Sequence, residues 1–250
     1  MSEFKLMSYN IHKGKSFLTR RHVFDEIKKV IHDVDADIVF LQEVRDFHSK
    51  DFKIYQKNQL EFLADFRYQG YYGKNCEYRK GHHGNAILTR YPILETENFN
   101  LTVSKLEKRG VLYNKLQLED TELFTFCTHL NLRKSDRNKQ IFLLEKIIEE
   151  IIPSKESNIL LVGDFNDFDN SIENYFMKKN YQIITNQKTF PNFLPILSPD
   201  KVFSKNIVIN NSYVLRKKEL LGLSDHLPIV SEMSFSQKKL ILNQESKIII

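Results

Sequence analysis

The chain has 250 residues, of which 41% are hydrophobic, and its formal net charge is +5 at pH 7. This length and apolar fraction are typical of a globular α/β protein with a sizeable core, and they exclude a low-complexity or disordered chain. The sequence contains no apolar run near the roughly 20 residues that a membrane-spanning helix needs, so we expect no transmembrane segment.

The first part of the chain predicts a strand, a helix and a second strand in succession. Residues 4–11 form a strand-like run, and residues 20–34 carry apolar side chains at helical spacing. Residues 37–44 then predict a buried strand with Glu43 near its carboxyl end. This order is a βαβ pattern. A helix at 59–66 and an apolar strand at 86–88 follow.

The second part predicts a hairpin, two helices and three further strands. Residues 111–118 and 123–129 are strand-like and flank a polar turn. A long amphipathic helix at 135–152 has Ser135 as a possible N-cap and ends before Pro153. The remaining expected elements are a strand at 159–162, a helix at 171–179, a strand near Lys201, a polar turn at 210–211 and a strand at 227–235.

We find no linker or repeat in the chain. We therefore predict one domain over residues 1–235, followed by an appendage of uncertain order at 236–250. Cys76 and Cys127 lie far apart, and Cys127 falls in an apolar run that is typical of a buried free thiol. A reducing compartment suits this pattern, although one disulfide stays open. Because the N-terminus has no apolar signal region, we expect a cytoplasmic protein, although non-classical export stays open. No feature of the sequence indicates an obligatory protein partner, and we expect a monomer.

Polar side chains gather where the predicted strands end. The buried run 159–162 stops at Gly163 and is followed by Asp164 and Asn166, a pattern that an ordinary turn would also produce. Other strand ends carry the same kinds of residue, namely Asn10, Glu43, His129, Asp225 and His226. Carboxylates and histidines without a cysteine cluster favour a hard cation such as Mg²⁺ or Mn²⁺ over zinc.

Six segments resemble the ordered motifs of the endonuclease/exonuclease/phosphatase superfamily. They are Ser8–His12, Leu41–Glu43, Gly84–Leu88, Thr128–Leu130, Gly163–Asn166 and Ser224–Pro228. The resemblance runs from residue 8 to about residue 235. It implies an α/β fold in a four-layer sandwich, with two mixed, mostly antiparallel β-sheets flanked by helices.

The resemblance also implies a role for each matched position. Glu43 would bind the metal with Asn10 beside it, and Asp225 would help at the same or a second metal position. Asp164 would orient or deprotonate the attacking water. The phosphoryl group would be contacted by Asn166, His129 and His226, and Asp200 would support His226. Asn85, His83 and Arg109 are candidate substrate-binding residues, and the sequence does not choose between the first two.

These roles imply a Mg²⁺-dependent phosphodiesterase whose substrate is nucleic acid or a phospholipid head group. Inositol-phosphate phosphomonoesterase activity and a catalytically silent binding module of the same fold are the alternatives. Residues 201–218 carry five basic side chains and no acidic one. This strip favours an anionic partner, although an ordinary solvated surface would look the same.

Overall fold

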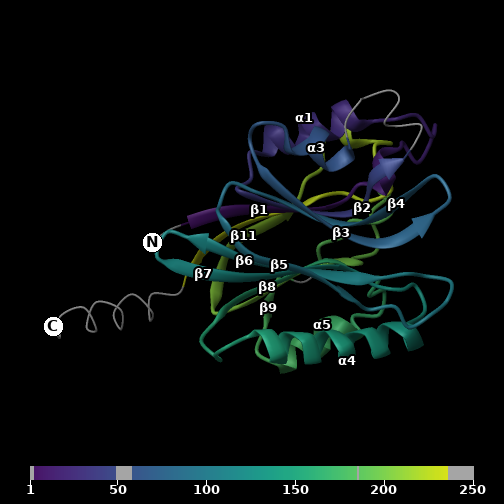
Figure 1. The fold of residues 1–250 in the computed structure, drawn as a ribbon. Helices are drawn as coiled ribbons and strands as arrows, with labels where there is room; N and C mark the ends of the chain where they lie inside the picture. Colours follow the sequence, from purple (N-terminus) through teal and green to yellow (C-terminus); the bar gives the residue numbers. More distant parts are fainter. Residues whose placement is uncertain (1–2, 49–57, 185, 236–250) are drawn as a thin grey trace.

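The computed structural model describes residues 3–48, 58–184 and 186–235. Within these residues two six-stranded sheets lie face to face (Figure 1). The first sheet contains β1 (Glu3–Asn10), β2 (Ile38–His48), β3 (Gln69–Tyr78), β4 (Gly81–Thr89), β11 (Ile207–Val214) and β12 (Ile229–Phe235), in the order β11-β12-β1-β2-β4-β3. The second contains β5 (Ile93–Asn100), β6 (Gly110–Leu118), β7 (Thr121–His129), β8 (Asn158–Asp164), β9 (Gln182–Ile183) and β10 (Asp200–Lys205), in the order β5-β6-β7-β8-β10-β9.

Helices cover the outer face of each sheet. Helices α1 (Phe24–Val34) and α3 (Gln59–Ala64) lie on the first sheet, and α4 (Lys134–Ile151) and α5 (Ser171–Lys178) lie on the second (Figure 1). The pairs β1–β2 and β7–β8 are parallel, whereas the other strand pairs of the described residues are antiparallel. The predicted four-layer sandwich of two mixed, mostly antiparallel sheets is therefore confirmed.

The central strands are apolar on both faces because each sheet is buried on both faces. Alternate residues of β8 divide between two clusters. Leu160 and Val162 pack between the sheets, whereas Ile159 and Leu161 pack against α4 and α5. The same alternation in β2 sends Phe40 inward and its neighbours toward α1. This arrangement accounts for the unbroken apolar runs in the sequence.

Several predicted boundaries are wrong. The first helix begins at Phe24 and not at residue 20, because Arg20 has a φ of 59° and His22 forms an isolated bridge with Lys15. A separate 3₁₀ turn, η1 (His12–Gly14), precedes this bridge. The expected turn at 210–211 lies inside β11, where the register with β12 shifts between Ile209 and Asn211. Helix α4 is preceded by Arg133 at its N-cap, with no side-chain cap bond, so Ser135 does not cap it. Strands β3 and β5 had no counterpart in the prediction.

The last described strand ends at Phe235, and residues 236–250 lie outside the described residues. Cys127 is a buried free thiol, as predicted. No helix among the described residues is long and apolar enough to span a membrane.

Candidate active site

Strand register brings three predicted site residues into one row. In the second sheet His129 of β7 pairs with Asp164 of β8, and Asp164 pairs with Asp200 of β10. Gly163 makes this row possible, because it has a φ of 145° and a Cβ there would lie 1.9 Å from the carbonyl oxygen of Thr128. Only glycine lets β8 approach β7 this closely in that backbone conformation. The row therefore depends on the Gly-Asp sequence at the end of β8.

Asp164 also receives hydrogen bonds from the first sheet and from its own loop. The Asn10 side-chain Nδ2 at the end of β1 donates to Asp164 Oδ2 at 3.0 Å. The Asn166 backbone N–H donates to Asp164 Oδ1 at 3.0 Å. Asn166 has a φ of 49°, and its amide nitrogen donates to the Leu130 carbonyl at 2.9 Å, which holds this loop against β7. Asp164 is 1% exposed, and these hydrogen bonds hold its buried carboxylate in place.

His226 reaches the same row from the loop between β11 and β12. Its Nδ1 donates to Asp200 Oδ2 at 2.8 Å, so the predicted contact between these two residues is confirmed. Its backbone N–H donates to Ser224 Oγ at 3.1 Å, and Ser224 Oγ donates in turn to the Asn10 carbonyl at 2.6 Å. Asp200 also accepts a hydrogen bond from the Thr189 hydroxyl. These contacts fix the orientation of the imidazole ring.

The two histidines flank the same carboxylate oxygen in opposite protonation states. His129 Nε2 lies 3.4 Å and His226 Nε2 lies 3.6 Å from Asp164 Oδ2. Burial and the nearby Arg109 charge hold the pKa of His129 well below its usual range. Burial also acts to lower the pKa of His226, but the Asp200 and Asp164 carboxylates outweigh it and raise that pKa to about 10. His226 is therefore cationic and His129 neutral at pH 7.

Burial raises the pKa of the Asp164 carboxyl to about 6, against the opposing effect of the His226 charge. Asp164 is thus ionised at neutral pH but is a stronger base than an exposed aspartate. Titratable groups whose surroundings push their pKa values apart are typical of acid–base sites. The arrangement can hold an anion beside His226 while Asp164 accepts a proton from water.

Glu43 and Asp225 form a second acidic group in the same region. Glu43 has a φ of 56° within β2, where the register with β4 is interrupted between Leu41 and Val44. Such an interruption redirects a side chain, and the left-handed conformation is unfavourable for glutamate unless the fold imposes it. Lys13 Nζ lies 3.0 Å from Glu43 Oε2, and His12 Nδ1 lies 3.2 Å from Asp225 Oδ1.

A cavity of about 210 Å³ opens at the centre of these residues. Eight of the predicted site residues line it: Asn10, Glu43, Arg109, His129, Asp164, Asn166, Asp225 and His226. Asp200 stands behind His226 and is 3% exposed. The structure therefore brings together nine of the eleven predicted residues.

Asn85 and His83 do not line this cavity. Asn85 is 1% exposed, and its amide nitrogen donates to the carbonyls of Gly110 and Cys127 at 3.1 and 3.2 Å. The prediction that Asn85 contacts substrate is thus not supported by its position. It links β4 to the second sheet next to Arg109, which is a positioning role. Burial and Lys13 lower the pKa of His83 to about 4, so His83 is neutral near the cavity.

Two groups in this region have the donor atoms that a metal ion needs. Ligand atoms of Asp164, Asp200 and His226 lie within 4.8 Å of one another, so this buried group could hold a metal ion. A doubly protonated imidazole, however, has no lone pair to offer a cation. The second group, Glu43, Asp225 and the Asn10 amide oxygen, consists of oxygen donors, which hard divalent cations prefer.

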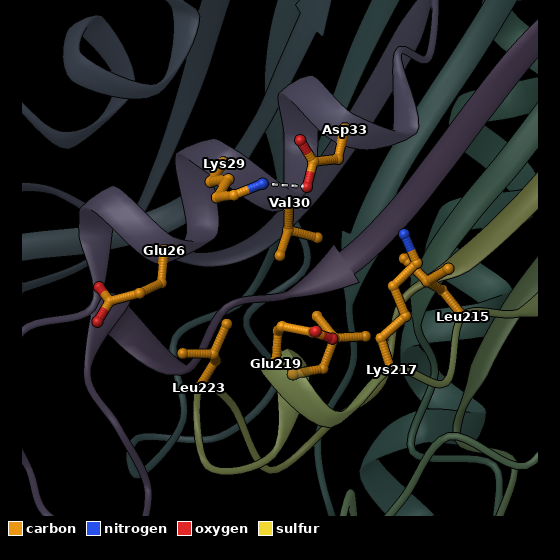
Figure 2. Close-up of a pocket in the computed structure, with 9 residues that line it drawn as sticks. Glu26, Lys29, Val30, Asp33, Leu215, Lys217, Glu219 and Leu223 are labelled. Atoms are coloured by element: carbon orange, nitrogen blue, oxygen red, sulfur yellow. Dashed lines mark hydrogen bonds and ion pairs between the residues drawn. The ribbon is translucent and has the colours of Figure 1, made fainter.

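A second cavity, of about 360 Å³, lies between α1 and the loop that follows β11 (Figure 2). Its floor is apolar (Val30, Leu215, Leu220 and Leu223), and it contains none of the predicted site residues. Lys29 on its rim pairs with Asp33 of the same helix at 2.6 Å. It has no buried acid–base group, so we assign the chemistry to the smaller cavity.

The sequence did not indicate the partners that complete the site. His12 ends the first motif and Lys13 follows it, but their pairing with Asp225 and Glu43 depends on η1. Leu132, Phe168 and Phe190 line the cavity without any motif that marks them. The basic strip at 201–218 is not one surface, because Lys201 is 3% exposed and pairs with Glu173 at 2.5 Å, whereas residues 216–218 are exposed.

Comparisons with known proteins agree with this geometry. The family described as Endonuclease/Exonuclease/phosphatase matches residues 7–226. A relative from Escherichia coli K12, "Uncharacterized protein YbhP", is 35% identical over 246 residues, which cover 92% of this chain and 96% of that protein.

Among solved structures, mannosyl-6-phosphatase Bt3783 from Bacteroides thetaiotaomicron has a TM-score of 0.75 at 21% identity and covers 93% of this chain and 100% of that chain. The D. rerio TDP2 complexed with single strand DNA product has a TM-score of 0.71 at 17% identity and covers 94% of this chain and 100% of that chain. At these identities the two structures show a shared fold.

Proposed function

Because the chain belongs to the endonuclease/exonuclease/phosphatase family, we propose that it is a hydrolase that cleaves phosphodiester bonds by in-line attack of water activated at Asp164. The observation that carries this proposal is the position of Asp164 Oδ2 between a neutral and a cationic imidazole in a buried pocket. Phosphoryl transfer depends mainly on positioning and charge stabilisation, which these groups supply.

Each residue then has a defined part. Asp164 accepts the proton of the attacking water, and Asn10 and the Asn166 backbone fix its carboxylate. Cationic His226 binds a non-bridging phosphoryl oxygen, and Asp200 holds its ring and its charge. His129 and Arg109 contact the phosphoryl group from the other side, with the Asn166 side chain beside them.

Glu43, Asn10 and Asp225 would hold Mg²⁺ or Mn²⁺ at the remaining wall of the pocket. The cation, when bound, would neutralise charge on the phosphoryl oxygens. Burial and the nearby Asp225 charge both act to raise the pKa of Glu43, but Lys13 holds that pKa below its usual value. The effect of Asp225 means that the two carboxylates lie near each other, which supports a shared metal site. Lys13 Nζ lies against Glu43 and the His12 ring lies against Asp225.

The fold alone does not choose the substrate, because the same fold carries a sugar phosphatase and a protein bound to a DNA product. We propose nucleic acid or a phospholipid head group. Phosphomonoesterase activity is the alternative, and a silent binding module is disfavoured because every predicted acid–base position is filled.

One substrate panel tests this proposal. Purified protein is given bis(p-nitrophenyl) phosphate, single-stranded DNA, phosphatidylglycerol, an inositol phosphate and mannose 6-phosphate, each with Mg²⁺ and with chelator. We expect phosphodiester hydrolysis that requires Mg²⁺ and is lost in Asp164→Asn. Release of phosphate from the monoesters alone would contradict the proposal, as would an inactive protein on every substrate.

A further inference from the structure

Half of the exposed large apolar side chains among the described residues lie in loops that carry or adjoin the site residues. Sixteen large hydrophobic residues of the described chain are exposed, and eight of them lie in loops that frame the catalytic pocket. The loops are 11–23, 101–109, 130–133, 165–170, 186–199 and 215–228. We call their eight exposed residues the apolar rim: Leu18, Leu106, Leu132, Phe168, Phe193, Leu194, Ile196 and Leu221.

Every one of these loops adjoins a strand end or turn that carries a site residue. Loop 11–23 follows Asn10, 101–109 ends at Arg109, and 130–133 follows His129. The other three adjoin Asp164, Asp200 and the Asp225–His226 pair. Leu132 and Phe168, which are 60% and 41% exposed, also line the pocket itself. The apolar rim therefore lies in the loops that carry or adjoin the site residues, and two of its members line the pocket.

The loop at 186–199 carries the most prominent part of the rim. Phe193, Leu194 and Ile196 are 66%, 60% and 57% exposed. The base of the loop is fixed, because the Asn192 N–H donates to the Asp225 carbonyl at 2.7 Å and its amide nitrogen donates to the Ser224 carbonyl at 3.0 Å. An exposed apolar tip on a hydrogen-bonded base is suited to contact with an external surface.

The loop at 186–199 also contacts a site residue and a neighbouring loop. The Phe190 ring lies 5.0 Å from that of His226. At the tip, the Phe193 ring stacks on Phe17 with centroids 6.3 Å apart. The same loop thus lines the pocket at Phe190 and carries its exposed tip a few residues further on.

The exposed charges on the same loops are mostly positive. The exposed basic residues are Arg20, Arg21, Lys105, Lys108, Arg133, Lys188, Arg216, Lys217 and Lys218. The exposed acidic residues in these loops are Asp169 and Glu219. Apolar side chains surrounded by cations are the combination that binds an anionic lipid surface.

We infer that this face docks on an anionic phospholipid bilayer and that the substrate is the head-group phosphodiester of a phospholipid. The inference rests on the proposed phosphodiesterase function. The apolar rim enters the interface, the cations contact lipid phosphates, and the pocket then lies at head-group level. Single-stranded nucleic acid suits the rim less well, since six of its eight residues are Leu or Ile, which offer no ring for base stacking.

Binding is tested by co-sedimentation with vesicles of phosphatidylglycerol and phosphatidylcholine in equal parts, with pure phosphatidylcholine for comparison. Chelator is present, so that hydrolysis plays no part in the result. The test variant combines Phe193→Ser with Leu194→Ser. The control combines Leu94→Ser with Phe142→Ser, which are 49% and 56% exposed and lie outside the framing loops. Circular dichroism and melting temperature check that both variants fold.

We expect the wild type and the control to sediment with the anionic vesicles. The test variant should bind about tenfold more weakly, because two side chains no longer enter the interface. A wild type that stays in the supernatant, or a test variant that binds like the control, would overturn the inference. So would binding of single-stranded DNA, and not of vesicles, that depends on Phe193. Failure of the phosphodiesterase proposal would appear instead as absent hydrolysis with unchanged vesicle binding.

Discussion

His226 Nδ1 donates a 2.8 Å hydrogen bond to Asp200 Oδ2, and both side chains are almost completely buried. A carboxylate on one ring nitrogen fixes the tautomer and the orientation of the imidazole, and it stabilises the protonated ring. The other nitrogen of His226 is thereby directed toward Asp164, 3.6 Å away. In the proposed mechanism Asp200 would act on the reaction through His226, as a positioning residue.

Replacing Asp200 by Asn should lower kcat by roughly 10–100-fold, the usual effect of losing a carboxylate that orients a site residue. It should also lower the pKa of His226, which is now raised by the Asp200 charge. The alkaline limb of the pH–rate profile would move to lower pH. The control is Asp167→Asn, because Asp167 is as buried but accepts the N–H groups of Ile172 and Glu173 at the start of α5. Unchanged turnover in Asp200→Asn would contradict this role.

The loss of activity at acidic pH should follow the protonation of Asp164. Burial raises its pKa to about 6, and the residue must be ionised to accept a proton. Activity is therefore expected above this pH and lost as the pH falls through about 6. A plot of log kcat/KM against pH measures this loss of activity. Full activity down to pH 4 would show that Asp164 is not the base.

Gly163→Ala should destabilise the fold as well as the site. The added Cβ would meet the Thr128 carbonyl at 1.9 Å, and φ at this position is 145°. Backbone strain of this kind costs about 1–3 kcal/mol before any displacement of β8 from β7 is counted. Urea unfolding measures the loss. Gly70→Ala is the matched control, because its Cβ would meet the flexible Leu60 side chain at 3.1 Å. Equal stabilities of the two variants would refute the explanation.

Asp164→Asn and His226→Ala should act on the same transition state. Each change is expected to lower kcat/KM by several orders of magnitude. The double variant should be little less active than the less active of the two single variants. The reason is that His226 Nε2 and Asp164 Oδ2 lie 3.6 Å apart and would act on the same phosphoryl group. A double-mutant cycle measures the coupling. Multiplication of the two single effects would place the residues in separate functions.

Much of the fold could be predicted from the sequence because buried strands and amphipathic helices have distinct apolar periods. Strands β3 and β5 were missed, since both are edge strands with at most one buried residue, and β5 carries Glu95 and Glu97. The surface position of the basic strip at 201–218 could not be predicted, for a related reason. A sequence does not show that Lys201 is buried beside Glu173 while Lys217 is exposed.

The site was predictable where its residues end a strand, as with Asn10, His129 and Asp164. It was not predictable where long-range contacts decide the position of a side chain. Asn85 lies in a motif, yet it is used to join the sheets. Leu132, Phe168 and Phe190 lie outside every motif, and only the folded loops bring them to the pocket.

The most direct test of the phosphodiesterase account is the Mg²⁺ dependence of bis(p-nitrophenyl) phosphate hydrolysis by the wild type and by Glu43→Gln. The wild type should be inactive with chelator and regain activity as Mg²⁺ is added. Glu43→Gln should fold normally but need much more Mg²⁺, because it loses a negatively charged oxygen ligand. Wild-type turnover that persists in chelator, or the same Mg²⁺ dependence in both proteins, would contradict the account.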